Sequence, residues 1–173
     1  GSKFEFFHEW KRLAEEEPGS VALETMLRGV CKKENFLDLF ENFILYDHSG
    51  GNTAKILARN HQYLGVNEAM KAYAARKLNG GKLGVFWHTQ GSGKSYSMVF
   101  LAQKIRRKVE GSPTFVILTD REELNAQISD TFENCGLLGK TKASQFIASS
   151  GDDLMQKLKG NPSFIFTLIQ KFN

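Results

Sequence analysis

The residues with the clearest chemical meaning form a glycine-rich run, His88-Thr89-Gln90-Gly91-Ser92-Gly93-Lys94-Ser95. Between a strand and a helix, such a loop turns backbone N–H groups inward around an anion, and the helix N-terminus adds partial positive charge. Lys94 is predicted to reach the β- and γ-phosphates of a nucleotide, and the Ser95 hydroxyl to be a ligand of Mg²⁺. A glycine-rich surface turn is the alternative, but it would not require Lys-Ser at these offsets. The predicted nucleotide-binding residues here are Thr89, Gln90, Gly91, Ser92, Gly93, Lys94, Ser95 and Tyr96, with Lys94 and Ser95 as the catalytic pair.

A second polar run, which contains Arg59 and Gln62, lies about thirty residues before the loop. A glutamine amide can donate to adenine N7 and accept from its N6 amine, a pattern that guanine does not match. An arginine three residues earlier can stack its guanidinium plane on the base. The run therefore suggests adenine recognition, although a polar helix start without a ligand explains the same residues.

Two further polar groups follow apolar runs downstream. Thr119, Asp120 and Arg121 follow the run 115–118, and Thr167, Gln170 and Lys171 follow the run 164–166. Because parallel sheets bind ligands at the carboxyl ends of their strands, these groups are candidates for contacts with a phosphodiester. The simpler alternative is that Asp120 caps the next helix and Arg121 is solvated.

The elements that would position these residues alternate in type. Apolar runs at 84–87, 115–118 and 164–166 predict buried strands, and periodic segments at 98–109, 122–134 and 153–158 predict the helices between and after them. This order predicts an α/β fold with a parallel sheet and right-handed crossovers. The first fifty residues and the segment 63–78 have helical periodicity, and the turn-rich run 47–52 is the best candidate boundary.

Composition sets broad limits. The chain has 173 residues, is 41% hydrophobic and has a net charge of +4. A disordered chain is excluded, and the apolar runs are too short to cross a bilayer. The two cysteines and four histidines have no metal-ligand spacing. The charge is compatible with a polyanionic partner but does not identify one.

Taken together, Arg59-x-x-Gln62, the Walker loop from Trp87 to Ser95, Leu118–Arg121 and the segment from Thr167 to Phe172 resemble the motor of type I restriction enzymes. Specifically, the chain resembles the first RecA-like domain of the restriction (R) subunit, a superfamily 2 translocase of double-stranded DNA. The loop of that family commonly has the form present here, with His88 at its start. The resemblance assigns Arg59 and Gln62 to the adenine-reading Q motif, and it assigns DNA contacts to Thr119, Asp120, Arg121, Thr167, Gln170 and Lys171.

The same resemblance implies an arrangement of domains and partners. Residues 1–50 would be a helical connector from the nuclease to the motor, and residues 51–173 an incomplete RecA-like ATP-binding domain that ends before the DEAD/DEAH-type motif. ATP and Mg²⁺ would be the cofactors, and double-stranded DNA with modification and specificity subunits the partners. The parent would be a cytoplasmic enzyme without membrane contact, and this piece would bind ATP but hydrolyse it poorly. Two alternatives stay open, another superfamily 2 motor and a P-loop module without a DNA role.

Overall fold

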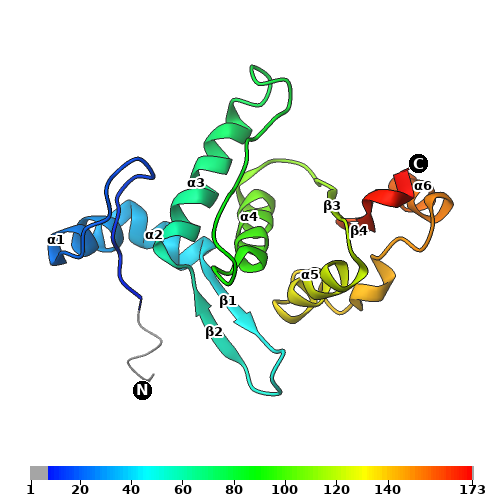
Figure 1. Ribbon diagram of the computed structural model, residues 1–173, viewed down its shortest axis with the longest axis horizontal. Helices are drawn as coiled ribbons and strands as arrows, with labels where there is room; N and C mark the ends of the chain where they lie inside the picture. Colours follow the sequence, from blue (N-terminus) through cyan, green and yellow to red (C-terminus); the bar gives the residue numbers. More distant parts are fainter. Residues whose placement is uncertain (1–7, 173) are drawn as a thin grey trace. The chain divides into compact units, whose positions relative to one another are not determined.

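The computed structural model describes residues 8–172, which form two compact units. One unit is built from residues 8–45 and 56–101, and the other from residues 46–55 and 102–172. Figure 1 shows the course of the chain. The helices are α1 (Leu23–Met26), α2 (Lys33–Asn42), α3 (Asn60–Ala74), α4 (Lys94–Lys108), α5 (Glu122–Asn134) and α6 (Gly151–Lys159). The strands are β1 (Ile44–Asp47), β2 (Ala54–Leu57), β3 (Phe115–Thr119) and β4 (Phe164–Leu168). A π-helical turn, Leu27–Cys31, follows α1, and short 3-10 turns cover Ala143–Gln145 and Ile169–Phe172.

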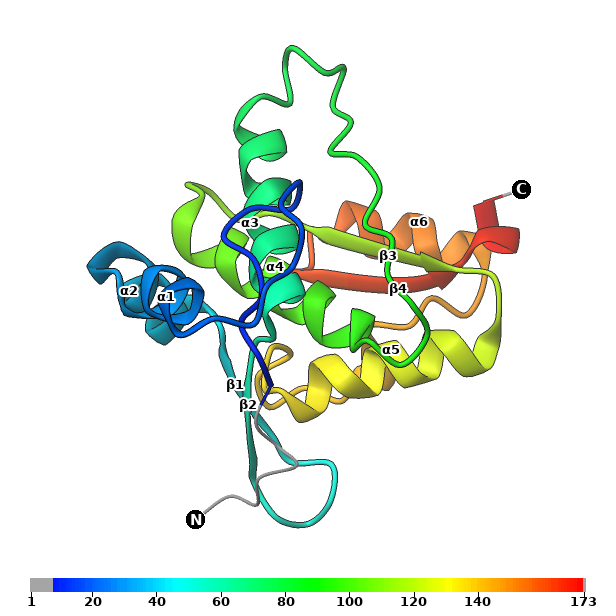
Figure 2. The same cartoon turned by 60° about the vertical axis from the view of Figure 1, so that its left-hand side comes forward.

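The second unit contains the predicted parallel pairing. β3 and β4 run parallel, with Phe115 opposite Phe164 and Ile117 opposite Phe166. Phe164 and Phe166 pack their rings against Phe132 of α5, whereas Ile165 packs with Leu154 of α6. Successive side chains of a strand point to opposite faces, so α5 and α6 cover the two sides of the pair, as Figure 2 shows. This double cover explains why neither strand alternates apolar with polar residues.

The helical part of the first unit has its core where three elements meet. The Phe43 ring lies 4.8 Å from the ring of Tyr63 in α3 and 5.7 Å from that of Phe100 in α4. Phe43 and Phe100 are fully buried. Along α2, Leu39 is buried while Phe36 and Phe40 remain exposed.

Two predictions about secondary structure were wrong. Residues 84–87 form no strand, and within them Val85 is 93% and Trp87 82% exposed. A strand with apolar faces is stable only when neighbouring strands complete its hydrogen bonds, and no strand of residues 8–172 pairs with this segment. Phe86 instead lies against α3, where a Cβ on Gly65 would come within 1.9 Å of its ring.

The first fifty residues are also less helical than predicted. Between residues 8 and 50 the structure has helical turns only from Leu23 to Asn42, and Ile44 begins β1. The turn-rich run 47–52 connects β1 to β2, which pair in a sheet of their own. The predicted α/β class is confirmed by helices around a small parallel sheet, whereas a full RecA-like sheet is not present among the described residues.

Candidate functional site

The glycine-rich loop lies at the N-terminus of α4, as predicted, but the segment before it is not the predicted strand. Gly91 and Gly93 have φ angles of +77° and +83°, a conformation that residues with a Cβ rarely adopt. The Ser92 N–H donates to the Thr89 carbonyl at 3.3 Å and the Ser97 N–H to the Gly93 carbonyl at 3.1 Å, so the turn leads directly into the helix. Thr89, Gln90 and Gly91 are exposed at the tip.

The side chains of the loop have distinct environments. The Lys94 ammonium donates to the carbonyls of His88 at 2.8 Å and Thr89 at 3.0 Å, which places its charge over the loop itself. The Ser92 hydroxyl is buried and has no hydrogen-bond partner among residues 8–172. Ser95 and Tyr96 are half-buried in the first turn of α4.

The predicted adenine-reading pair lies against this loop because α3 begins there. Gln62 accepts from the Arg59 N–H at 2.9 Å through Oε1 and donates to the Gly93 carbonyl at 2.9 Å through Nε2. The first bond stabilises the start of α3, and the second ties that start to the phosphate loop. The amide has two donor and two acceptor positions, and these two bonds occupy one of each. Gln62 is buried, whereas Arg59 is exposed.

Two residues to which the sequence analysis gave no role, His61 and Asn60, also connect the start of α3 to neighbouring segments. The His61 ring nitrogen Nε2 lies 3.0 Å from the Ser92 carbonyl, and the His61 ring lies 4.7 Å from the ring of His88. Asn60 bonds the backbone of Lys11 and Arg12. The available signal was four polar residues in succession at a helix start, where one N-cap would suffice.

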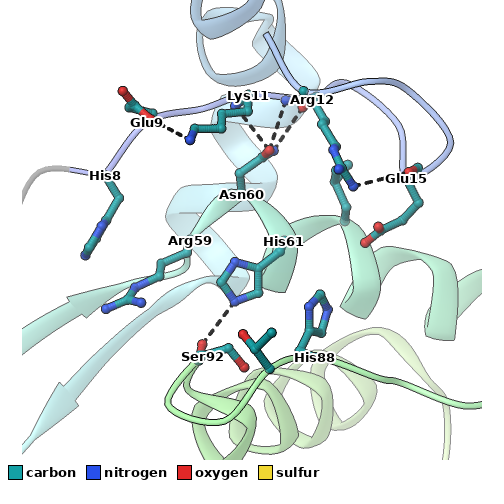
Figure 3. A pocket seen from close by; sticks show the side chains of 13 residues that line it. His8, Glu9, Lys11, Arg12, Glu15, Arg59, Asn60, His61, His88 and Ser92 are labelled. Carbon is teal, nitrogen blue, oxygen red and sulfur yellow. Dashed lines mark hydrogen bonds and ion pairs between the residues drawn. The ribbon is translucent and has the colours of Figure 1, made fainter. Parts of the chain in front are cut away.

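A cavity of about 420 Å³ opens beside the loop (Figure 3). Its walls include Arg59, His61, His88 and Ser92, and the segment around Arg12 lies along another side. Burial lowers the pKa of His88, and the nearby His61 and Lys94 lower it further, whereas Glu15 acts in the opposite direction. His88 therefore favours its neutral form. The positive glycine φ angles, the helix N-terminus and the buried Ser92 hydroxyl fit a phosphate group at this loop.

The predicted DNA-contacting residues meet at the ends of β3 and β4, in the second unit. The Gln170 amide donates to the Asp120 carbonyl at 3.1 Å, which joins the two polar groups. Arg121 is exposed and lies 3.5 Å from the Asp120 carboxylate. Arg121, rather than Asp120, is the residue that precedes α5. Polar side chains are therefore exposed along this edge.

Three residues of this group donate side-chain hydrogen bonds to backbone carbonyls. Thr119 and Thr167 are buried, and their hydroxyls donate to nearby backbone carbonyls at 3.4 Å. The Lys171 ammonium donates to the Ala148 carbonyl. In this structure Asp120, Arg121 and Gln170 are the exposed members of the predicted set.

Comparison with known proteins gives the family. Residues 61–173 match the SWI2/SNF2 ATPase family. The chain belongs to this family. The match begins at His61 and includes the phosphate loop and both polar groups at the strand ends. An ATPase family requires a nucleotide site, in agreement with the chemistry predicted for the loop.

No helix within residues 8–172 is long and apolar enough to cross a membrane.

Individual relatives of this chain are restriction enzyme subunits. The chain is 38% identical to the type I restriction enzyme HindI endonuclease subunit of Haemophilus influenzae, over 98% of its length and 17% of that protein. It is 33% identical to the putative type I restriction enzyme MjaIXP endonuclease subunit of Methanocaldococcus jannaschii, over 88% of its length and 14% of the relative. The predicted resemblance is confirmed. The chain spans less than a fifth of either relative's length.

Proposed function

We propose that this chain is the ATP-binding part of an ATP-dependent translocase of double-stranded DNA, in the R subunit of a type I restriction endonuclease. The observation that supports this most directly is the 2.9 Å hydrogen bond from Gln62 to the Gly93 carbonyl. It joins the predicted base-reading residue to the predicted phosphate loop within one compact unit. The family and its restriction relatives supply the context.

The loop's own residues would hold the phosphates. Backbone N–H groups at the start of α4 provide partial positive charge, and Lys94 exchanges its two carbonyl partners for phosphate oxygens. Ser95, in the first turn of α4, is the predicted Mg²⁺ ligand. Bound Mg²⁺ would neutralise the charge that develops between the β- and γ-phosphates. Arg59, at the exposed start of α3, remains the predicted stacking partner of the adenine.

The DNA role is assigned to the edge formed by the ends of β3 and β4. A translocase must accept any sequence, so contacts to phosphates suit it better than contacts to bases. Arg121 and Gln170 are exposed there, and Lys171 lies nearby in the chain. In the parent enzyme this motor would act with modification and specificity subunits in the cytoplasm and drive DNA movement before cleavage.

The test is a calorimetric titration of the 173-residue chain with ATP and with GTP, each with Mg²⁺. ATP should bind, and GTP should bind at least tenfold more weakly. Lys94→Ala removes charge-assisted bonds to phosphate and should weaken ATP binding by about tenfold or more, since such bonds contribute about 1.5–3 kcal/mol. Gln62→Ala should weaken ATP binding and reduce the preference over GTP.

Matched controls are Lys82→Ala and Gln156→Ala, because both residues are exposed and lie outside the site. Neither should change ATP affinity. Equal binding of ATP and GTP would favour a generic P-loop module over the motor. A folded chain that binds no nucleotide would contradict the proposal.

A further inference from the structure

The segment 8–20, here called the strap, runs past the first turn of α3 and is fastened there by one side chain. Asn60 Oδ1 accepts the N–H groups of Lys11 at 3.2 Å and Arg12 at 3.0 Å, and Asn60 Nδ2 donates to the Arg12 carbonyl at 2.9 Å. Figure 3 shows these three bonds. Asn60 is buried, so three amide interactions are withdrawn from water together. The strap is thus specifically attached to the start of α3.

A second contact, independent of Asn60, fixes the strap through Trp10. The Trp10 ring lies 5.3 Å from the ring of Tyr63 in α3. A Cβ on Gly29 would come within 2.1 Å of the Trp10 indole nitrogen, so only glycine leaves room for the ring there. The Ser20 N–H also donates to the Lys11 carbonyl at 2.9 Å, which closes the strap into a loop. Packing and hydrogen bonding therefore hold it in one position.

The docked strap forms a wall of the cavity beside the phosphate loop. Arg12 and Glu15 of the strap line this cavity, as do His88 and Ser92 of the phosphate loop. His61 lies between the two sides in Figure 3, bonded to the Ser92 carbonyl. The start of α3 consequently contacts the strap through Asn60 and the phosphate loop through His61 and Gln62, which are consecutive residues.

We propose that the strap is part of the nucleotide-binding site and that its docking on Asn60 is coupled to nucleotide binding. This inference rests on the proposed function and extends it to a segment that lies outside the family match. A nucleotide that binds the docked state more tightly shifts the strap toward docking, and the docked strap strengthens nucleotide binding by the same factor. Asn60 is a positioning residue in this arrangement, because it acts through the strap.

Hydrogen exchange of two amides measures the coupling directly. The N–H groups of Lys11 and Arg12 donate to Asn60, so their exchange with water requires these hydrogen bonds to open. NMR exchange rates of these amides are recorded with and without saturating ATP and Mg²⁺. We expect ATP to slow both at least fivefold. Exchange that is unchanged while ATP binds would overturn the proposal.

Two variants release the strap by different routes. Asn60→Ala removes its three hydrogen bonds, and Gly29→Ala displaces Trp10 without altering a residue that lines the cavity. Each should speed exchange at Lys11 and Arg12 and weaken ATP binding several-fold, at most by the factor with which ATP slows exchange in the unaltered chain. If both variants show these effects, the strap is their common cause. If Asn60→Ala does not fold, Gly29→Ala alone tests the proposal.

The control is Asn79→Ala, an exposed asparagine in the turn after α3. It should change neither exchange nor affinity. Normal ATP affinity in both strap variants, or an equal loss in the control, would overturn the coupling alone. Failure of ATP to bind the unaltered chain would instead remove the proposed function as well, and that result is seen before any variant is made.

Discussion

At the scale of single residues, Gly93 is subject to two separate constraints. Its φ of +83° disfavours any side chain, and a Cβ there would lie 2.8 Å from Gln62 Nε2. The first constraint concerns the backbone alone. The second concerns the hydrogen bond that connects α3 to the phosphate loop. Different measurements should therefore separate them.

Gly93→Ala is predicted to lower the free energy of unfolding by about 1–2 kcal/mol, the cost of a left-handed residue with a Cβ. It should also displace Gln62 and weaken ATP binding by about tenfold or more. Urea unfolding and calorimetry check the two effects. Gly81→Ala is the matched control, because Gly81 has a φ of +82° with no atom within 4 Å. It should lose similar stability and keep its ATP affinity, and an equal affinity loss would contradict a specific role for Gln62.

Among the helices and strands, the end of α5 is connected by Glu133 to the start of the 3-10 turn Ala143–Gln145. Its carboxylate accepts the Ala143 N–H at 2.6 Å and lies 3.0 Å from the Lys142 ammonium. The Ala143 N–H, and then Lys142, lower the pKa of Glu133 below its ordinary value of 4.5. The unfolded chain consequently binds more protons than the folded chain just below that value, and stability rises with pH there.

The contribution of Glu133 should be present above about pH 4.5 and lost as the pH falls through its lower folded pKa. Glu133→Gln keeps an acceptor for Ala143 but does not titrate, so its free energy of unfolding should depend less steeply on pH between about 3 and 5. Thermal unfolding across this range measures the difference. Lys142→Ala should retain most of the dependence, because the larger cause is the backbone N–H. An unchanged slope in Glu133→Gln would exclude this contribution.

At the scale of the whole molecule, the nucleotide motif and the proposed DNA motifs belong to different compact units. Lys94 and Gln62 lie in the first unit, and Arg121 and Gln170 lie in the second. Substitutions in the first unit should therefore change only the affinity for nucleotide. Substitutions in the second unit should change only the affinity for DNA, when each ligand is measured without the other. This separation lets the two parts of the proposed function be tested independently.

Arg121→Ala is predicted to weaken binding of duplex DNA similarly for all sequences, and to reduce the slope of log affinity against log salt by about one. ATP affinity should not change. Fluorescence anisotropy at several salt concentrations measures both quantities. Lys159→Ala, which removes one exposed charge from α6, is the control and should leave the slope nearly unaltered. A sequence-dependent loss would argue against a contact to phosphate.

Local patterns were sufficient for several features of the fold and the site. Helix α5 has the predicted bounds, β3 and β4 pair in parallel as predicted, and the phosphate loop begins α4. These features depend on periodicity and on residues close together in the sequence, such as the glycines of the loop. The site residues named from those motifs also lie at a helix start or a strand end.

Sequence patterns alone were enough to predict helix α5, the parallel strands β3 and β4 and the candidate phosphate-binding residues, but not the hairpin of β1 and β2. The lack of a strand partner for residues 84–87 emerged from the three-dimensional fold, because strand pairing depends on distant segments. Only the tertiary structure decided that Gln62 and Gly93 meet across 31 positions, and that Asn60 binds Lys11 across 49. Such contacts depend on how packed elements bring side chains together, and no spacing along the chain encodes that distance.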